Sequence, residues 1–192
     1  EHRISIAVTV RNLLFFSLIF TLLLALIIPL SLDEYYYFQW GSWLHLSYFD
    51  HPPLVGWLMG LSQGVHSIAP GMIRWPFIVL SQGTLLLWLK ISKLEKLNDA
   101  RTMLFILVAL FNPLWGMGAF ISTPDIPLLF FWSMSILFTR YILSRDHWVD
   151  YLLLGASLGM GFLSKYQIVL FLPCLLILIW QKSLLKKIIV WR

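Results

Sequence analysis

Long apolar segments alternate with short loops rich in Lys and Arg along almost the whole of this chain. A helix needs about 20 apolar residues to cross a bilayer, so candidate spans cover residues 13–32, 72–90, 102–119, 126–143, 149–163 and 167–181. The last two are short and would tilt or pack inside the bundle. Only 12% of the residues are charged, about half the share of a soluble domain. The pattern predicts an all-α polytopic transmembrane bundle of about six spans with no separate second domain.

Composition excludes several other classes of protein. The single cysteine, Cys174, lies in an apolar run, so the chain has neither a disulfide framework nor a CxxC metal site. The net charge of +5 comes from basic residues in short loops, as membrane topology requires, and does not indicate nucleic-acid binding. No small-residue cleavage site follows the first apolar segment, which we expect to remain as an anchored helix. The chain starts with Glu1 and stops just after a span, so we expect it to be the N-terminal part of a longer protein.

The basic residues predict the orientation of the bundle. Cytoplasmic loops of membrane proteins carry an excess of Lys and Arg. Twelve of the fourteen basic residues fall on one side if the spans above are correct: Arg3, Arg11, Lys90, Lys93, Lys96, Arg101, Arg140, Arg145, Lys182, Lys186, Lys187 and Arg192. Arg74 and Lys165 fall on the opposite, extracytoplasmic side. The acidic residues Asp33, Glu34, Asp50 and Asp125 lie there as well.

Residues 33–71 form a long first external loop in this topology. Ser31 and Glu34 have the spacing of a capping box, which predicts a helix that begins there. Segment 53–69 is apolar with helical periodicity, but a span there would place the basic loop 90–101 outside. We therefore expect amphipathic helices at the membrane surface, with 53–69 interfacial or re-entrant.

Three aspartates at the ends of apolar segments are candidate catalytic or binding groups. A carboxylate held at the membrane surface can accept a proton from an acceptor hydroxyl, which is a role for Asp33. Asp125, between two prolines at the start of a span, can contact a polar acceptor or sugar hydroxyls. The alternative for Asp33, Glu34 and Asp125 is a purely local role at helix N-termini, where acidic residues favour the helix dipole.

Asp50 and His51 belong to the most specific string of the chain, Tyr-Phe-Asp-His-Pro-Pro. The two prolines restrict the backbone and hold a carboxylate beside an imidazole. Such a pair can bind a divalent metal ion or orient an anionic substrate. The alternative is that Asp50 caps the helix that follows Pro53.

The two basic residues on the external side also have two interpretations. Lys165 lies between two short spans and Arg74 precedes another. Either could bind the phosphate of a membrane lipid. Either could instead extend from a helix end toward the headgroups.

Together these strings resemble membrane-embedded glycosyltransferases of the GT-C fold. The resemblance rests on Asp33-Glu34, the string from Tyr48 to Leu54, Arg74-Trp75-Pro76, the string from Ser122 to Leu128 and the string from Gly161 to Tyr166. They are similar to the glycosyltransferase family 39 type, which includes protein O-mannosyltransferases and lipid A aminoarabinose transferases. Family members usually have several more spans and often a C-terminal external domain.

The resemblance implies an inverting transfer of a sugar from a polyprenyl-phosphate donor to a lipid, polysaccharide or protein acceptor. The chemistry would take place on the extracytoplasmic face of the bacterial inner membrane. The implied catalytic residues are Asp33 and Asp125, and the implied substrate-binding residues are Glu34, Asp50, His51, Arg74, Lys165 and Tyr166. Asp50 and His51 would also be the ligands of a divalent metal ion, if one is used.

Two other classes of function remain open at this point. A transporter or flippase of a lipid-linked substrate would carry polar residues near the middle of its spans, often in broken helices. In this chain the notable charges lie at the ends of spans. A non-catalytic membrane scaffold would use the three aspartates only as helix caps, each contributing about 1 kcal/mol.

Overall fold

The structure is a computed structural model that describes residues 2–112 and 118–181, with side chains from residue 9 onward. All regular secondary structure in these residues is helical. The long helices are α1 (His2–Ile27), α4 (Trp75–Leu94), α5 (Asp99–Phe111), α6 (Asp125–Arg145), α7 (Trp148–Ser164) and α8 (Phe171–Gln181). Between α1 and α4 lie α2 (Leu32–Ser42), α3 (Leu54–Leu61) and the 3₁₀ turns η1 (Gln63–Val65) and η2 (Pro70–Arg74). Two further 3₁₀ turns, η4 (Gly118–Phe120) and η5 (Tyr166–Leu170), precede α6 and α8.

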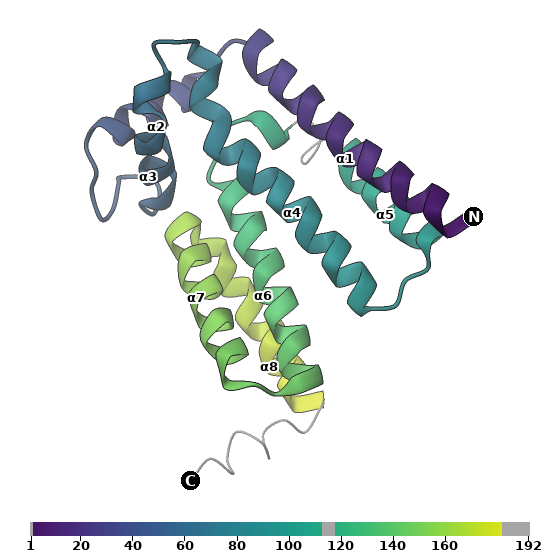
Figure 1. The fold of residues 1–192 in the computed structure, drawn as a ribbon. Helices are drawn as coiled ribbons and strands as arrows, with labels where there is room; N and C mark the ends of the chain where they lie inside the picture. The colour runs from purple at the N-terminus through teal and green to yellow at the C-terminus, as the bar shows by residue number, and fades with distance from the viewer. Residues whose placement is uncertain (1, 113–117, 182–192) are drawn as a thin grey trace.

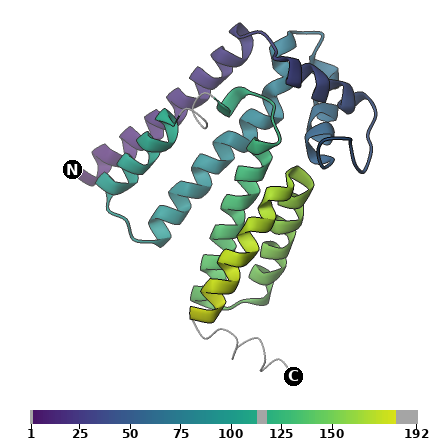
Figure 2. The same ribbon diagram turned by 180° about the vertical axis from the view of Figure 1, so that it is seen from behind.

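The helices form a bundle in which α4 lies between two groups. Figures 1 and 2 show α1 and α5 on one side of α4, and α6, α7 and α8 on the other. The α6–α7 hairpin makes the most extensive helix contact, and α4 packs along α6. The short helices α2 and α3 pack on each other at one end of the bundle, next to the C-terminal end of α1 and the start of α4.

The two ends of the bundle differ in charge, as the sequence predicts. The α2–α3 end gathers the end of α1 and the starts of α4 and α6 with the end of α7, and thus the segments that carry Asp33, Asp50, Asp125 and Lys165. The opposite end holds the α4–α5 and α6–α7 connections, with their Lys and Arg residues. We call these the acidic end and the basic end.

The prediction of a helical membrane bundle is confirmed, while the number of spans stays a prediction. Within the part of the chain that the structure describes, three helical segments are long and apolar enough to cross a membrane: Thr9–Ile27, Pro70–Leu94 and Asp125–Arg145. The apolar segments Leu54–Val65, Trp148–Ser164 and Tyr166–Gln181 are shorter. Part of the expected span 102–119, residues 113–117, lies outside the described residues.

Local sequence explains where the first helices end and begin. The first span was expected to run to residue 32, but α1 ends at Ile27. Pro29 is the physical reason, because its ring disfavours helical backbone at the preceding residue. The predicted capping box is confirmed: Ser31 Oγ accepts a hydrogen bond from Glu34 N at 3.3 Å, and Ser31 N donates to Glu34 Oε2 at 2.9 Å.

A close approach of two backbones fixes α1 against the start of α4. A Cβ atom added to Gly71 in η2 would lie 1.9 Å from the carbonyl oxygen of Ala25 in α1. Only glycine fits at this distance. This contact brings the end of α1 to η2, whose last residue is Arg74.

We expect Gly71→Ala to destabilise the protein by about 1–3 kcal/mol, because the new methyl group must push η2 away from α1. Thermal unfolding in detergent micelles measures this. Gly155→Ala in α7 is the matched control, since nothing lies within 4 Å of the added methyl group and alanine favours a helix. Equal stability of the Gly71→Ala protein and the wild type would show that the close approach is absent.

Candidate functional site

A buried ion pair between Arg74 and Glu34 lies at the acidic end. Arg74 is 1% exposed and Glu34 is fully buried. The guanidinium binds the carboxylate with two parallel hydrogen bonds, from Nε to Oε1 at 2.7 Å and from Nη2 to Oε2 at 2.8 Å. This fork geometry is the strongest arrangement of such a pair.

The remaining donors of Arg74 satisfy the end of α1. Its Nη1 donates to the carbonyl oxygens of Ala25 and Ile28, both at 2.8 Å, and its Nη2 donates to that of Pro29 at 3.0 Å. All five N–H groups of the guanidinium are therefore used. The last carbonyls of a helix have no partners within that helix, so one side chain supplies partners here.

Glu34 connects the same cluster to the segment before α6. Its Oε1 also accepts a hydrogen bond from the backbone N–H of Ser122 at 3.0 Å. Burial raises the pKa of Glu34, but hydrogen bonds from Arg74, Ser122 and Ser31 outweigh it, so the pKa lies below its usual value. The structure thus gives Glu34 and Arg74 a structural role, with every donor and both carboxylate oxygens engaged. Neither side chain has a free donor or acceptor left for the substrate-binding role that was predicted from the sequence.

The three aspartates, in contrast, are exposed. Asp33 lies in the first turn of α2, one residue before the buried Glu34. Asp50 lies in the loop between α2 and α3, four residues before α3 begins. It does not cap that helix, because the N-cap is Pro53 and no side chain donates or accepts there. The capping alternative for Asp50 therefore fails.

Asp125 and Lys165 lie together although 40 residues separate them. Lys165 Nζ contacts Asp125 Oδ1 at 2.7 Å, with the lysine side chain 22% exposed and the aspartate 54% exposed. Asp125 is the first residue of α6, where the N-cap Pro124 provides no side-chain cap, and Lys165 is the C-cap of α7. The structure thus brings together two candidate site residues that nothing in the sequence links. Tyr166 is half exposed and its ring packs on Phe162 with 5.1 Å between centroids.

Sequence reasoning missed the aromatic residues that connect these carboxylates. A hydrogen bond to Asp50 raises the pKa of the exposed Tyr36. Burial, followed by the charges of Asp33, Asp50 and Asp125, raises the pKa of Tyr37 to about 12. All three aspartates are therefore close enough to act on one hydroxyl group. The signal in the sequence was the placement of two tyrosines three and four residues after Asp33, one helical turn away.

The residues at this end do not fit a complete metal site. Residues 9–112 and 118–181 contain no group of three or more His, Cys, Asp and Glu side chains placed to hold a metal ion. Asp50 and His51 together supply two of the four or more ligands that such sites need. The His51 ring instead contacts Tyr37 and Trp40, with centroid distances of 5.8 and 6.4 Å.

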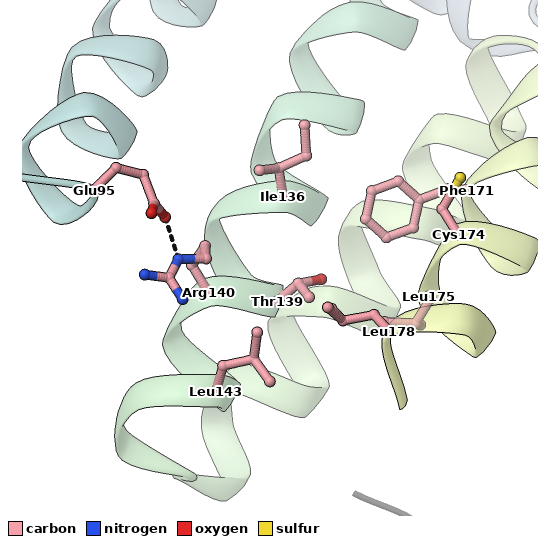
Figure 3. Close-up of a pocket in the computed structure, with 9 residues that line it drawn as sticks. All are labelled: Glu95, Ile136, Thr139, Arg140, Leu143, Phe171, Cys174, Leu175 and Leu178. Carbon is pink, nitrogen blue, oxygen red and sulfur yellow. Dashed lines mark ion pairs between the residues drawn. The ribbon is translucent and has the colours of Figure 1, made fainter. Parts of the chain in front are cut away.

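A groove of about 350 Å³ lies toward the basic end, between α6, α8 and the residue that follows α4. Figure 3 shows Ile136, Phe171, Leu175 and Leu178 along it, and the ion pair between Arg140 and Glu95 at one edge. None of the residues predicted for the site lines this groove. Of this groove and the acidic end, the acidic end is therefore the feature that brings together the candidate residues predicted from the sequence.

The architecture and the acidic end together define the class of the protein, an integral membrane helical bundle with charged groups gathered at one end of the helices. The profile of the dolichyl-phosphate-mannose-protein mannosyltransferase family matches residues 50–192. The chain belongs to this family and is a membrane glycosyltransferase of the GT-C type. Searches of curated proteins and of solved structures found no match. The matched region contains Asp50, Asp125 and Lys165, whereas Asp33 precedes it.

We expect Arg74→Gln to destabilise the protein by about 3–5 kcal/mol, because it leaves the buried carboxylate of Glu34 without its cation.

The Arg74→Gln change should also alter the pH dependence of stability. In the wild type the lowered pKa of Glu34 means that the pair stabilises the fold above the usual value of 4.5 and loses this effect as the pH falls. In the variant, burial without Arg74 raises that pKa, so acidification should stabilise the variant relative to the wild type.

Thermal unfolding in micelles between pH 4 and pH 8 tests both effects. Arg140→Gln is the matched control, since the Arg140–Glu95 pair is partly exposed and should contribute less than about 1 kcal/mol. Similar losses for the two variants would contradict the structural role of the Arg74–Glu34 pair.

Proposed function

We propose that the protein is an inverting glycosyltransferase that moves a sugar from a polyprenyl-phosphate donor to a lipid, polysaccharide or protein acceptor. The observation that carries the proposal is the convergence of Asp33, Asp50, Asp125 and Lys165 at one end of a bundle that belongs to a glycosyltransferase family. The resemblance of the strings around them to enzymes that use such donors supports the choice of donor.

In this proposal Asp33 is the general base. An inverting transfer needs a group that removes the proton of the acceptor as its oxygen or nitrogen attacks the anomeric carbon. Asp33 is exposed at the start of α2, while its neighbour Glu34 is buried and bonded to Arg74. Of this adjacent pair, only Asp33 can therefore meet a substrate.

Lys165 serves the leaving group. Cleavage of the bond between the anomeric carbon and the phosphate oxygen leaves a polyprenyl phosphate, and a nearby cation stabilises its added charge. The ammonium of Lys165 is a compact charge suited to phosphate. Asp125 lies 2.7 Å from this ammonium and holds it at the acidic end before a donor arrives. Asp50, His51 and Tyr166 are proposed to line the same pocket.

The proposed location follows from charge. The last turns of α4 and α6, which carry Lys93 and Arg145, lie at the end of the bundle opposite the starts of α2 and α6. A cytoplasmic position of that basic end agrees with the excess of Lys and Arg in cytoplasmic loops. The carboxylates would then face the extracytoplasmic side of a bacterial inner membrane, where a lipid-anchored donor can reach them.

We expect Asp33→Asn in the full-length protein to lower sugar transfer by at least about 100-fold while leaving expression and thermal stability unchanged, because the amide cannot accept the proton. Transfer of radiolabelled sugar from polyprenyl-phosphate donors in membranes measures this. Asp99→Asn is the matched control, since Asp99 also lies in the first turn of a helix but at the basic end. Full activity of the Asp33→Asn protein would remove Asp33 from the mechanism. A stable wild type that transfers sugar from none of the donors would contradict the proposed function.

A further inference from the structure

One aromatic side chain contacts or shares a buried cluster with the segments that carry the exposed aspartates. Tyr37 is 8% exposed and belongs to α2, on the turn that follows Asp33. Asp33 and Tyr37 are four residues apart, so α2 holds them one helical turn from each other.

The second segment meets the same ring through His51, the residue after Asp50. The Tyr37 and His51 rings lie edge to face, with centroids 5.8 Å apart and planes at 65°. The Trp40 ring, 5.1 Å from Tyr37, contacts His51 as well. These contacts hold the Asp-His-Pro-Pro segment against α2.

The third segment joins through Ile126, the residue after Asp125. Tyr37 and Ile126 belong to one buried cluster with Val55, Met59, Ile73 and Phe77. This cluster brings together α2, α3, the start of α4 and the start of α6. The ring of Tyr37 thus contacts the residue after Asp50 and shares a buried cluster with the residue after Asp125, while the aspartates themselves are exposed.

The electrostatics agree with this placement. The charges of Asp33, Asp50 and Asp125 all act on the Tyr37 hydroxyl, which stays protonated with a pKa of about 12. Like charges that lie close together repel one another, so something must hold the segments in place. Lys165 compensates Asp125, and the Tyr36 hydroxyl donates to Asp50.

We propose that Tyr37 is a positioning residue whose ring sets the relative placement of Asp33, Asp50 and Asp125 for the transfer reaction. The role in catalysis rests on the proposed function, but the placement of the carboxylates does not. Tyr37 itself need not touch substrate. A displacement of about 1 Å in an active site can cost up to about 100-fold in rate, which makes such a residue important without chemistry of its own.

The test compares Tyr37→Leu, which removes the ring, with Tyr37→Phe, which keeps it. The readout that needs no activity is the coupling rate of each aspartate with a water-soluble carbodiimide and an amine, followed residue by residue with mass spectrometry on the full-length protein. We expect Tyr37→Leu to change the rates at Asp33, Asp50 and Asp125 together by about threefold or more, and Tyr37→Phe to restore the wild-type pattern.

Two control variants separate positioning from packing. Phe77→Leu alters the same buried cluster from α4 and should lower stability without changing the pattern at the three aspartates. Tyr35→Leu changes the exposed neighbour on α2 and should change neither the stability nor the labelling pattern.

In an active preparation, Tyr37→Leu should lower kcat about tenfold or more with little change in the KM for the donor, and Tyr37→Phe should restore kcat.

The labelling experiment decides the proposal even if no donor is turned over. An unchanged pattern in Tyr37→Leu, or the same change in Phe77→Leu, would overturn the positioning role. Failure of Tyr37→Phe to restore the pattern would also overturn it, since the ring would then not be the relevant part. Absence of transfer in the wild type with the expected labelling pattern would instead count against the proposed function alone.

Discussion

The acidic end of the molecule depends on the buried bond between Arg74 and Glu34. Burial of a lone charge is costly, and a pair is retained only when its geometry and its other hydrogen bonds are satisfied. Here the guanidinium uses every donor, and its partners include the carbonyl of Ala25 near the end of α1 and those of Ile28 and Pro29 just after it. Through Glu34 the pair also reaches Ser122 before α6. One interaction thus joins the end of the first long helix, the start of α2, the start of α4 and the approach to α6.

This pair explains why two neighbouring acidic residues lie in different environments. Glu34 is turned into the protein and saturated with donors, whereas Asp33, one residue earlier, is exposed at the surface of the same turn. Because the Arg74–Glu34 pair fixes the start of α2, the exposed surface around this helix can carry groups that repel one another. Lys165 offsets Asp125, and the charges of all three aspartates reach the buried Tyr37. A buried carboxylate and an exposed one therefore lie at adjacent positions of the sequence.

Much of the fold was predictable from the sequence, and the features that were not predictable have physical causes. Apolar length and the distribution of Lys and Arg predicted a helical bundle with an acidic and a basic end, because both patterns are properties of single segments. The capping box at Ser31 is equally local. The partner of Arg74 was not predictable, since Glu34 lies 40 residues away and only packing brings the two together. The same holds for Asp125 with Lys165, and for the ring of Tyr37, which a helical pattern cannot distinguish from ordinary core.

The most direct test of the account is an experimental structure of the full-length protein with a polyprenyl-phosphate sugar bound. We predict that the phosphate contacts Lys165, that the sugar lies between Asp33 and Asp125, and that the Arg74–Glu34 pair stays intact beneath them. A phosphate bound to Arg74 with Glu34 displaced, or a donor held in the groove between α6 and α8, would contradict it.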